Sequence, residues 1–362
     1  MNVRLKSLDI LRAFALFLVL GRHVDVYPGY NLFWKGLTKR WFMGGWVGVD
    51  LFFVLSGFLI SGLLFSEHKQ FGCISFKRFF IRRGFKIYPP FYFMIILSIL
   101  GGFNADRYAR SNLSSEFFFL QDYVVGIWNH TWSLGVEEKF YCFLPLLLIV
   151  LSCQSKKRNA QPFRLIPFLF IFIAAECLYF RVLTSHYLPY NNYTHLFPFH
   201  LRMDSLFFGV VISWYYHYYS VQFNSIVRRF KSFFLGAGMF LLMPAFLFEI
   251  ETTPWICTFG FTFFYIGCGL ILMAFLGYDF KPSLLIKAIS LIGASSYSIY
   301  LWHMMISKWG FGFLKADIGS YSFWVFFTFF YLIISILLGI FMTRVIEFPM
   351  LRLRDRLFPS RG

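Results

Sequence analysis

The chain has 362 residues, of which 58% are hydrophobic, 23% aromatic and only 14% charged. Its 53 Phe outnumber all the Lys, Arg, Asp and Glu side chains together. A soluble domain carries charge on about a quarter of its residues, so this composition excludes one and predicts an all-α, polytopic membrane protein. It also excludes intrinsic disorder. The six Cys are scattered without a CxxC pair, which excludes a small disulfide scaffold and predicts buried free thiols.

Ten segments are long and apolar enough to be transmembrane helices, because a span needs roughly 17 to 25 residues. They lie near 8–24, 46–66, 86–103, 139–153, 165–181, 203–219, 233–249, 255–276, 293–313 and 323–345. If the chain starts inside, the cytoplasmic segments hold 22 Lys and Arg and the outer segments hold nine. This asymmetry predicts that both termini are cytoplasmic, and it assigns the net charge of +17 to membrane topology rather than to nucleic acid.

The pattern predicts one transmembrane domain over residues 1–362, with no appended soluble domain. The first span is expected to remain in the mature protein, because Asp9 and Arg12 interrupt its apolar run and no small-residue cleavage site follows. The longest outer segment, near 104–138, is expected to carry function, because connections of that length in a compact domain usually do.

Ionisable side chains inside spans are costly and therefore mark candidate functional residues. Arg12 and His23 are eleven residues apart, which gives about 20° of angular offset and roughly 16 Å of rise on a helix. Both are therefore expected on one stripe, although Arg12 could instead extend to the membrane interface. The imidazole of His23 can take a proton from an attacking hydroxyl or receive an acyl group itself.

The second span begins with a carboxylate, Asp50, in GVDLFFVLSGFLI. It either points inward as a functional group or sits at the interface near a helix N-terminus. The small residues Ser56 and Gly57 that follow predict close helix packing.

A compact cationic cluster, Arg82, Arg83 and Lys86, precedes two prolines in RRGFKIYPP. Such a cluster can bind the phosphates of a donor, with Arg making bidentate bonds and Lys acting as a point charge. The alternative is a basic anchor to anionic lipid.

Further polar side chains gather in three motifs. In HTWSLGVEEKFY, a carboxylate could orient an imidazole or act as a base, although no GxSxG motif supports a hydrolase. The other two motifs are HLRMDSLFFG and SYSIYLWH, and neither they nor the rest of the chain contain a metal-binding spacing such as HExxH. The candidate supporting or substrate-binding residues are Asp9, His130, Trp132, Ser133, Arg202, Asp204, Tyr297, Tyr300 and His303, and Glu137 is a candidate catalytic acid.

Seven motifs in this order resemble the acyltransferase 3 family of integral membrane O-acyltransferases. They are LDILRAFALFLVLGRH, GVDLFFVLSGFLISG, RRGFKIYPPFY, HTWSLGVEEKFY, RMDSLFFG, SYSIYLWH and the terminal EFP, and together they cover almost the whole chain. The resemblance assigns Arg12 and His23 to the family's Arg-x10-His motif, Arg82, Arg83 and Lys86 to its basic motif, and Glu137 to its acid. Lys86 departs from the family pattern, which often has a second Arg there.

The resemblance implies an enzyme of the bacterial inner membrane that transfers an acyl group, most often acetyl, from cytoplasmic acetyl-CoA. The acceptor would be a hydroxyl of a polysaccharide, either undecaprenyl-linked or part of a lipopolysaccharide O-antigen. No metal and no nucleic acid would take part. In this hypothesis His23 is the general base or transient acyl carrier, Glu137 or Asp50 orients it, and Arg12 stabilises the thioester or its oxyanion.

Two other functions also suit a chain with about ten spans and charges inside them. A secondary transporter or glycan flippase would be favoured by broken paired helices and an inverted repeat, neither of which stands out in the sequence. A glycan polymerase would be favoured by a large Arg-rich outer loop, but the long outer segment contains only Arg107 and Arg110.

Overall fold

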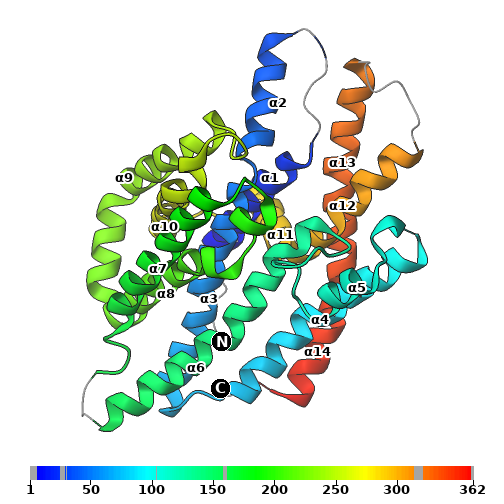
Figure 1. Ribbon diagram of the computed structural model, residues 1–362. Coiled ribbons are helices and arrows are strands. Elements are labelled where there is room, and N and C mark those ends of the chain that lie inside the picture. Colours follow the sequence, from blue (N-terminus) through cyan, green and yellow to red (C-terminus); the bar gives the residue numbers. More distant parts are fainter. Residues whose placement is uncertain are drawn as a thin grey trace. The chain divides into compact units, whose positions relative to one another are not determined.

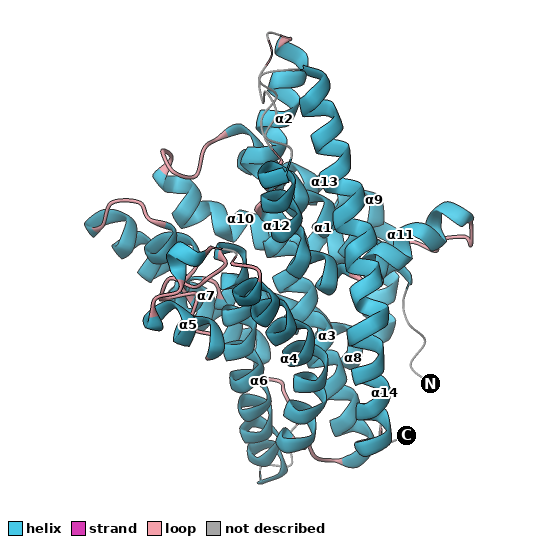
Figure 2. Ribbon diagram, turned by 90° about the vertical axis from the view of Figure 1, so that its right-hand side faces the viewer, coloured by secondary structure: helices cyan, strands magenta, loops and turns pink. Residues whose placement is uncertain are grey.

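The computed structural model describes residues 6–24, 29, 31–102, 104–157, 161–313 and 321–359. Within these ranges the secondary structure consists of helices and loops, without a strand (Figure 2). The all-helical class predicted from composition is confirmed.

Each of the ten predicted spans falls on a helix (Figure 1). These helices are α1 (Lys6–Arg22), α3 (Val47–Phe71), α4 (Phe76–Leu100), α6 (Trp132–Lys157), α7 (Ile166–Tyr187), α8 (Met203–Tyr218), α9 (Ser220–Leu247), α10 (Phe261–Leu276), α12 (Ser296–Phe313) and α13 (Tyr321–Met342). Four further α-helices were not predicted: α2 (Leu32–Gly44), α5 (Arg110–Phe117), α11 (Leu284–Ala294) and α14 (Phe348–Leu357). They are short, and each is too short to have been recognised as a span by the length criterion.

Several helical stretches are long and apolar enough to cross a membrane. Among the described residues these are Leu32–Phe71, Ile166–Tyr187, Ser220–Leu247, Ile256–Leu276 and Phe323–Leu357. Helices α11 and α12 together make a sixth candidate, which is bent by 74° at the break between them. The chain therefore has the apolar helices of a membrane protein, while a total of ten spans and the side on which the termini lie stay predictions.

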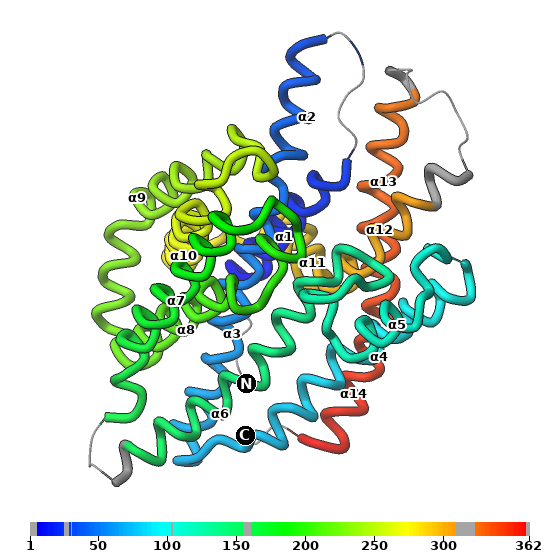
Figure 3. The backbone as a smooth tube through the Cα atoms, viewed as in Figure 1, coloured from blue at the N-terminus to red at the C-terminus, as the bar shows by residue number. Residues whose placement is uncertain are grey.

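The chain forms two compact units. Unit 1 combines residues 1–49, 81–105 and 280–362, and unit 2 combines residues 50–80 and 106–279. Inside unit 1, α1 packs against α11 and α12, and α12 packs along α13. Inside unit 2, α10 packs along α9 and also contacts α8, which packs against α7 (Figure 3).

Glycines allow helices to approach closely in both units. A Cβ at Gly57 of α3 would overlap the carbonyl oxygen of Leu206 in α8, and a Cβ at Gly209 would overlap that of Val54. The close packing predicted at the small residues of α3 is thus confirmed. In unit 1, Gly293 of α11 lies against the carbonyl of Asp9 in the same way.

The cysteines are free, as predicted, but only half of them are buried. Cys177, Cys257 and Cys268 are buried, whereas Cys73, Cys142 and Cys153 are exposed. The prediction of burial was wrong for the exposed three, because a thiol is apolar enough to lie on a helix face that points away from the protein interior.

Candidate active site

Two histidines lie side by side in unit 1. His23 occupies the turn that follows the last residue of α1, and His303 is fully buried in α12. Their ring centroids are 5.0 Å apart. The Nδ1 of His303 lies 2.6 Å from the carbonyl oxygen of Tyr300. Because a carbonyl only accepts, Nδ1 carries the proton and Nε2 is the nitrogen that can accept one.

The polar side chains of α12 fix it to neighbouring elements of unit 1. The hydroxyl of Tyr297 donates to the carbonyl of Ile87 in α4 at 2.8 Å. The hydroxyl of Ser298 donates to Glu347 at 3.2 Å. These bonds fix the orientation of the helix that carries His303, while the supporting role of Tyr297 in the reaction stays a prediction.

Arg12 lies in the middle of α1 and forms an ion pair of 3.3 Å with Asp9, one turn earlier. The Asp9 side chain is buried, whereas a quarter of the Arg12 side chain is exposed. Helix α1 ends at Arg22, so His23 lies one residue beyond the end of the helix. The sequence had predicted that it lies on the same helix face as Arg12. The guanidinium of Arg22 bonds to the carbonyl of Phe42 and lies over its ring.

The predicted phosphate-binding cluster lies on α4, in the part of that helix that belongs to unit 1. Arg82 forms an ion pair of 3.1 Å with Asp355 of α14 and donates to the carbonyl of Phe358. Arg83 and Lys86 are half-buried on the same helix. The helix continues through the two prolines, Pro89 and Pro90. An anionic donor would therefore have to displace the Asp355 carboxylate from Arg82.

Four charged side chains of unit 2 form two fully buried ion pairs. Arg202 contacts Asp50 at 2.6 Å, and Arg181 contacts Asp204 at 2.5 Å. All four side chains have zero exposure. The guanidinium of Arg202 also lies 4.1 Å from the ring centroid of Phe261. Asp50 thus points inward, as one of its two interpretations required, and its described partner is an arginine.

The acid of the HTWSLGVEEKFY motif belongs to a chain of hydroxyl groups. Glu137 accepts a hydrogen bond of 2.8 Å from Tyr141, whose hydroxyl lies 2.7 Å from that of Ser56. This chain joins α6 to α3 within unit 2. Because His23 belongs to unit 1, the orientation of His23 by Glu137 or Asp50 stays a prediction.

The other candidates of this motif lie at the start of α6. Ser133 is buried in its first turn, and His130 is buried against the ring of Trp128. Trp132 stacks on Phe197 with centroids 4.6 Å apart. These side chains thus build the packing of unit 2 around the N-terminus of α6.

Sequence reasoning missed several residues of unit 2. Arg181, the last residue of the span expected near 165–181, was not named as a candidate, but it is buried in α7 and its partner Asp204 is 23 positions away. Glu116 is fully buried in α5 and accepts bonds from the backbone of Trp128 and the hydroxyl of Thr131. Its burial raises the pKa of the carboxyl group to about 7. A carboxylate inside the apolar run EFFFL was the available signal for Glu116.

Comparison with known proteins decides the family. The sequence profile of the acyltransferase 3 family, which describes an acyltransferase domain, matches residues 5–344. The chain belongs to this family. It is 27% identical over 327 residues to the O-acetyltransferase OatA of Staphylococcus aureus strain NCTC 8325, and to the OatA of strain COL to the same extent.

Each of these two alignments covers 83% of this chain and 50% of the relative. The chain therefore spans about half the length of the curated relatives it matches. No solved structure matches the sequence.

Proposed function

We propose that this chain is an O-acyltransferase that moves an acyl group, acetyl in the first instance, from cytoplasmic acyl-CoA to a hydroxyl of a cell-surface polysaccharide or its lipid-linked precursor. The observation that carries the proposal is the pair His23 and His303, which brings together two motifs 280 positions apart in a chain of an acyltransferase family. The names of the relatives support acetyl as the group and oxygen as its acceptor.

The proposed enzyme has ten spans in the inner membrane of a bacterium, with both termini in the cytoplasm. The coincidence of ten helices with the ten apolar segments supports this topology. The excess of Lys and Arg in the segments assigned to the cytoplasm supports the orientation.

In the proposed reaction, the oxygen of the acceptor hydroxyl attacks the carbonyl carbon of the thioester. His23 takes the hydroxyl proton, a C–O bond forms, the C–S bond breaks, and the leaving CoA sulfur receives the proton. A variant of this course passes the acyl group through His23 before the acceptor takes it. Arg12 stabilises the oxyanion, His303 supports His23, and Glu137 or Asp50 orients it.

The donor phosphates would bind Arg82, Arg83 and Lys86. Guanidinium groups suit phosphate because they make two parallel bonds, and Lys86 adds a point charge. On this proposal the bond between Arg82 and Asp355 opens when the donor binds.

The test uses membranes that contain the protein, radiolabelled acetyl-CoA, and polysaccharide from a host strain that lacks the gene. The wild type should transfer label to the polysaccharide. The variant His23→Ala should lose about 100-fold or more of this activity, because general base catalysis contributes about 10²–10⁴-fold. His186→Ala is the matched control, because His186 is an exposed histidine at the end of α7. Full transfer by His23→Ala at an equal protein level would contradict the assignment.

One observation favours the transporter or flippase as the second candidate. Discontinuous helices are common in secondary transporters, and α11 and α12 are bent by 74° at their break. The same assay separates the two candidates, because a transporter moves no label onto the polysaccharide.

A further inference from the structure

Two segments of unit 2 run antiparallel to each other beside the start of α6. Tyr123 contacts His200, and Asn129, six positions later, contacts Tyr193, seven positions before His200. Between these two points, Gly126 also contacts Tyr193. The two contact points carry a set of polar and aromatic side chains, here called the polar aromatic surface, which consists of Arg107, Tyr123, Asn129, Tyr193 and His200.

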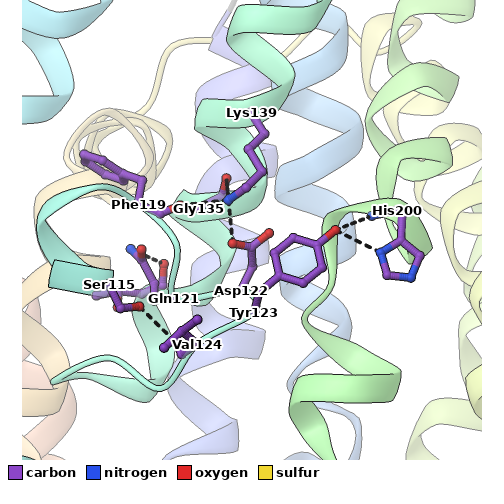
Figure 4. Close-up of polar contacts among 10 residues, drawn as sticks. Ser115, Phe119, Gln121, Asp122, Tyr123, Val124, Gly135, Lys139 and His200 are labelled. Atoms are coloured by element: carbon purple, nitrogen blue, oxygen red, sulfur yellow. Dashed lines mark hydrogen bonds and ion pairs between the residues drawn. The ribbon is translucent and has the colours of Figure 1, made fainter. Parts of the chain in front are cut away.

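The first contact point presents two rings whose planes are nearly parallel. The hydroxyl of Tyr123 and the Nδ1 of His200 are 2.9 Å apart, the ring planes differ by 12°, and the centroids are 5.8 Å apart (Figure 4). The two rings therefore turn their faces in nearly the same direction. Tyr123 is 43% exposed, and His200 is also exposed. The pair therefore offers a flat aromatic area to the surroundings.

An ion pair anchors the residue that directly precedes Tyr123. The amine of Lys139 contacts Asp122 at 2.5 Å and donates to the carbonyls of Phe119 and Gly135 (Figure 4). Asp122 is fully buried and directly precedes Tyr123. This arrangement fixes the backbone at Tyr123 before a ligand arrives, which lowers the entropic cost of binding.

The second contact point supplies hydrogen-bond donors. Arg107 donates to the Oδ1 of Asn129 at 2.5 Å, and the hydroxyl of Tyr193 donates to the same oxygen at 3.3 Å. Because the amide oxygen is held by two donors, the amide nitrogen of Asn129 keeps its two hydrogens for other partners. Asn129 is exposed, and Arg107 and Tyr193 are half-exposed.

The polar aromatic surface is joined to the interior through a column of rings. Tyr193 meets Phe197 edge to face at 5.0 Å, and Phe197 stacks on Trp132. Trp132 in turn lies 6.0 Å from the guanidinium of the buried Arg202. Trp132, which the sequence marked as a substrate candidate, thus supports the surface from behind.

We propose that the polar aromatic surface binds the acceptor glycan, an inference that rests on the proposed function. A sugar ring offers a C–H face, which packs on a flat aromatic area, and hydroxyl groups, which accept from amide and guanidinium donors. Six extended residues span at most about 20 Å, so the two contact points lie within the length of a few sugar units. Tyr123 and His200 take the face of one sugar, and Asn129 and Arg107 take the hydroxyl groups of another.

The test measures acetyl transfer while the concentration of unacetylated host polysaccharide is varied. The variants Tyr123→Ala and Asn129→Ala should each raise the KM for polysaccharide about tenfold, since an aromatic contact or a hydrogen bond contributes on this scale. The KM for acetyl-CoA should not change. Tyr187→Ala is the matched control, because Tyr187 is 73% exposed at the end of α7. An unchanged KM for polysaccharide in both variants would overturn the proposal.

A second measurement on the wild type does not depend on folding of the variants or on catalysis. Polysaccharide should protect Tyr123, Tyr193 and His200 from hydroxyl-radical oxidation and leave Tyr187 unprotected. Protection without any transfer of label would reject the proposed function and keep the glycan site. Transfer of label without protection would reject the glycan site alone. Protection by anionic lipid vesicles in place of polysaccharide would assign the surface to the membrane and also reject the proposal.

Discussion

Units 1 and 2 both bury carboxylates and imidazoles, but a different polar pairing stands out in each unit. Unit 1 holds the imidazoles of His23 and His303 with their rings 5.0 Å apart. Unit 2 holds four full charges in the pairs of Arg202 with Asp50 and of Arg181 with Asp204. An imidazole is neutral in one of its protonation states, so it can be buried without a counter-ion. A buried charge must be paired, because its desolvation costs several kcal/mol.

On the proposed function, the difference indicates which part each unit would play. A histidine can take up and release a proton during a reaction without leaving a permanent charge behind. A carboxylate that is held by an arginine cannot do so without leaving that arginine uncompensated. Unit 1 is therefore suited to proton transfer and unit 2 to holding helices α3, α7 and α8 together. Three predictions test this division, beginning with the largest effect.

The substitution Arg202→Met should destabilise the protein most. It leaves Asp50 buried without its partner, and breaking a buried ion pair in this way costs about 3–5 kcal/mol. That cost is a large part of the 5–15 kcal/mol that stabilises a typical domain. Thermal unfolding in detergent, followed by size-exclusion chromatography, should show a clear loss of folded protein.

The double variant Asp50→Leu with Arg202→Met is the control, because it removes both charges together. It should recover most of the lost stability, since apolar side chains of similar size often replace a buried pair without penalty. Recovery with normal acetyl transfer would confine Asp50 to a structural role and leave Glu137 as the candidate orienting acid. If the single variant unfolds no earlier than the wild type, the ion pair does not hold the unit together.

The second prediction concerns Glu116, a buried carboxyl group of unit 2 that accepts hydrogen bonds from two neutral groups, the backbone of Trp128 and the hydroxyl of Thr131. The pKa of Glu116 is about 7 in the folded protein, against an ordinary value of 4.5. The folded state therefore keeps a proton that the unfolded state has lost, so stability is highest below about pH 4.5 and falls as the pH rises through 7. The total change is at most about 3 kcal/mol.

Hydrogen exchange in the peptides that cover 116–131, corrected for the intrinsic pH dependence, measures this effect. Protection should be greater at pH 5 than at pH 8 in the wild type. Glu116→Gln should remove the difference, because an amide oxygen still accepts from Trp128 and Thr131 but does not ionise. Glu176→Gln, at an exposed carboxylate, should retain the difference. Equal protection of the wild type at both pH values would mean that this group does not control the segment.

The sequence predicted the helices better than the contacts between them. Apolar runs located all ten predicted segments on helices, because hydropathy reports burial in an apolar medium. The short helices α2 and α5 were not predicted, since a mixed pattern of polar and apolar residues over 8–13 positions carries little signal. Arg181 was not named as a candidate, because hydropathy alone does not distinguish a paired arginine from a solvated one.

The sequence predicted many of the individual residues of the candidate site, but it did not predict which of them contact one another. Both His23 and His303 were named as candidates, yet nothing in the spacing within either motif shows that the two rings meet. Asp50 was expected to face an imidazole, and the partner that the structure gives it is Arg202, 152 positions away. Such pairings depend on how helices pack, which a single sequence does not encode in any local period.

The smallest effect is expected for a substitution of His303. Its result decides whether unit 1 acts through one histidine or through two. In His303→Gln, a side chain of similar size keeps a hydrogen-bonding group but loses the ring nitrogen that accepts a proton. We expect kcat to fall about tenfold, which corresponds to about 1.4 kcal/mol, with the KM for acetyl-CoA and the unfolding temperature unchanged.

His195→Gln is the matched control, because His195 is a buried histidine of unit 2. A larger solvent isotope effect on kcat in His303→Gln alone would show that proton transfer had become slower, as a supporting base requires. An unchanged kcat and isotope effect would leave His23 to act without help from the second imidazole, and the proximity of the two rings would then be a matter of packing.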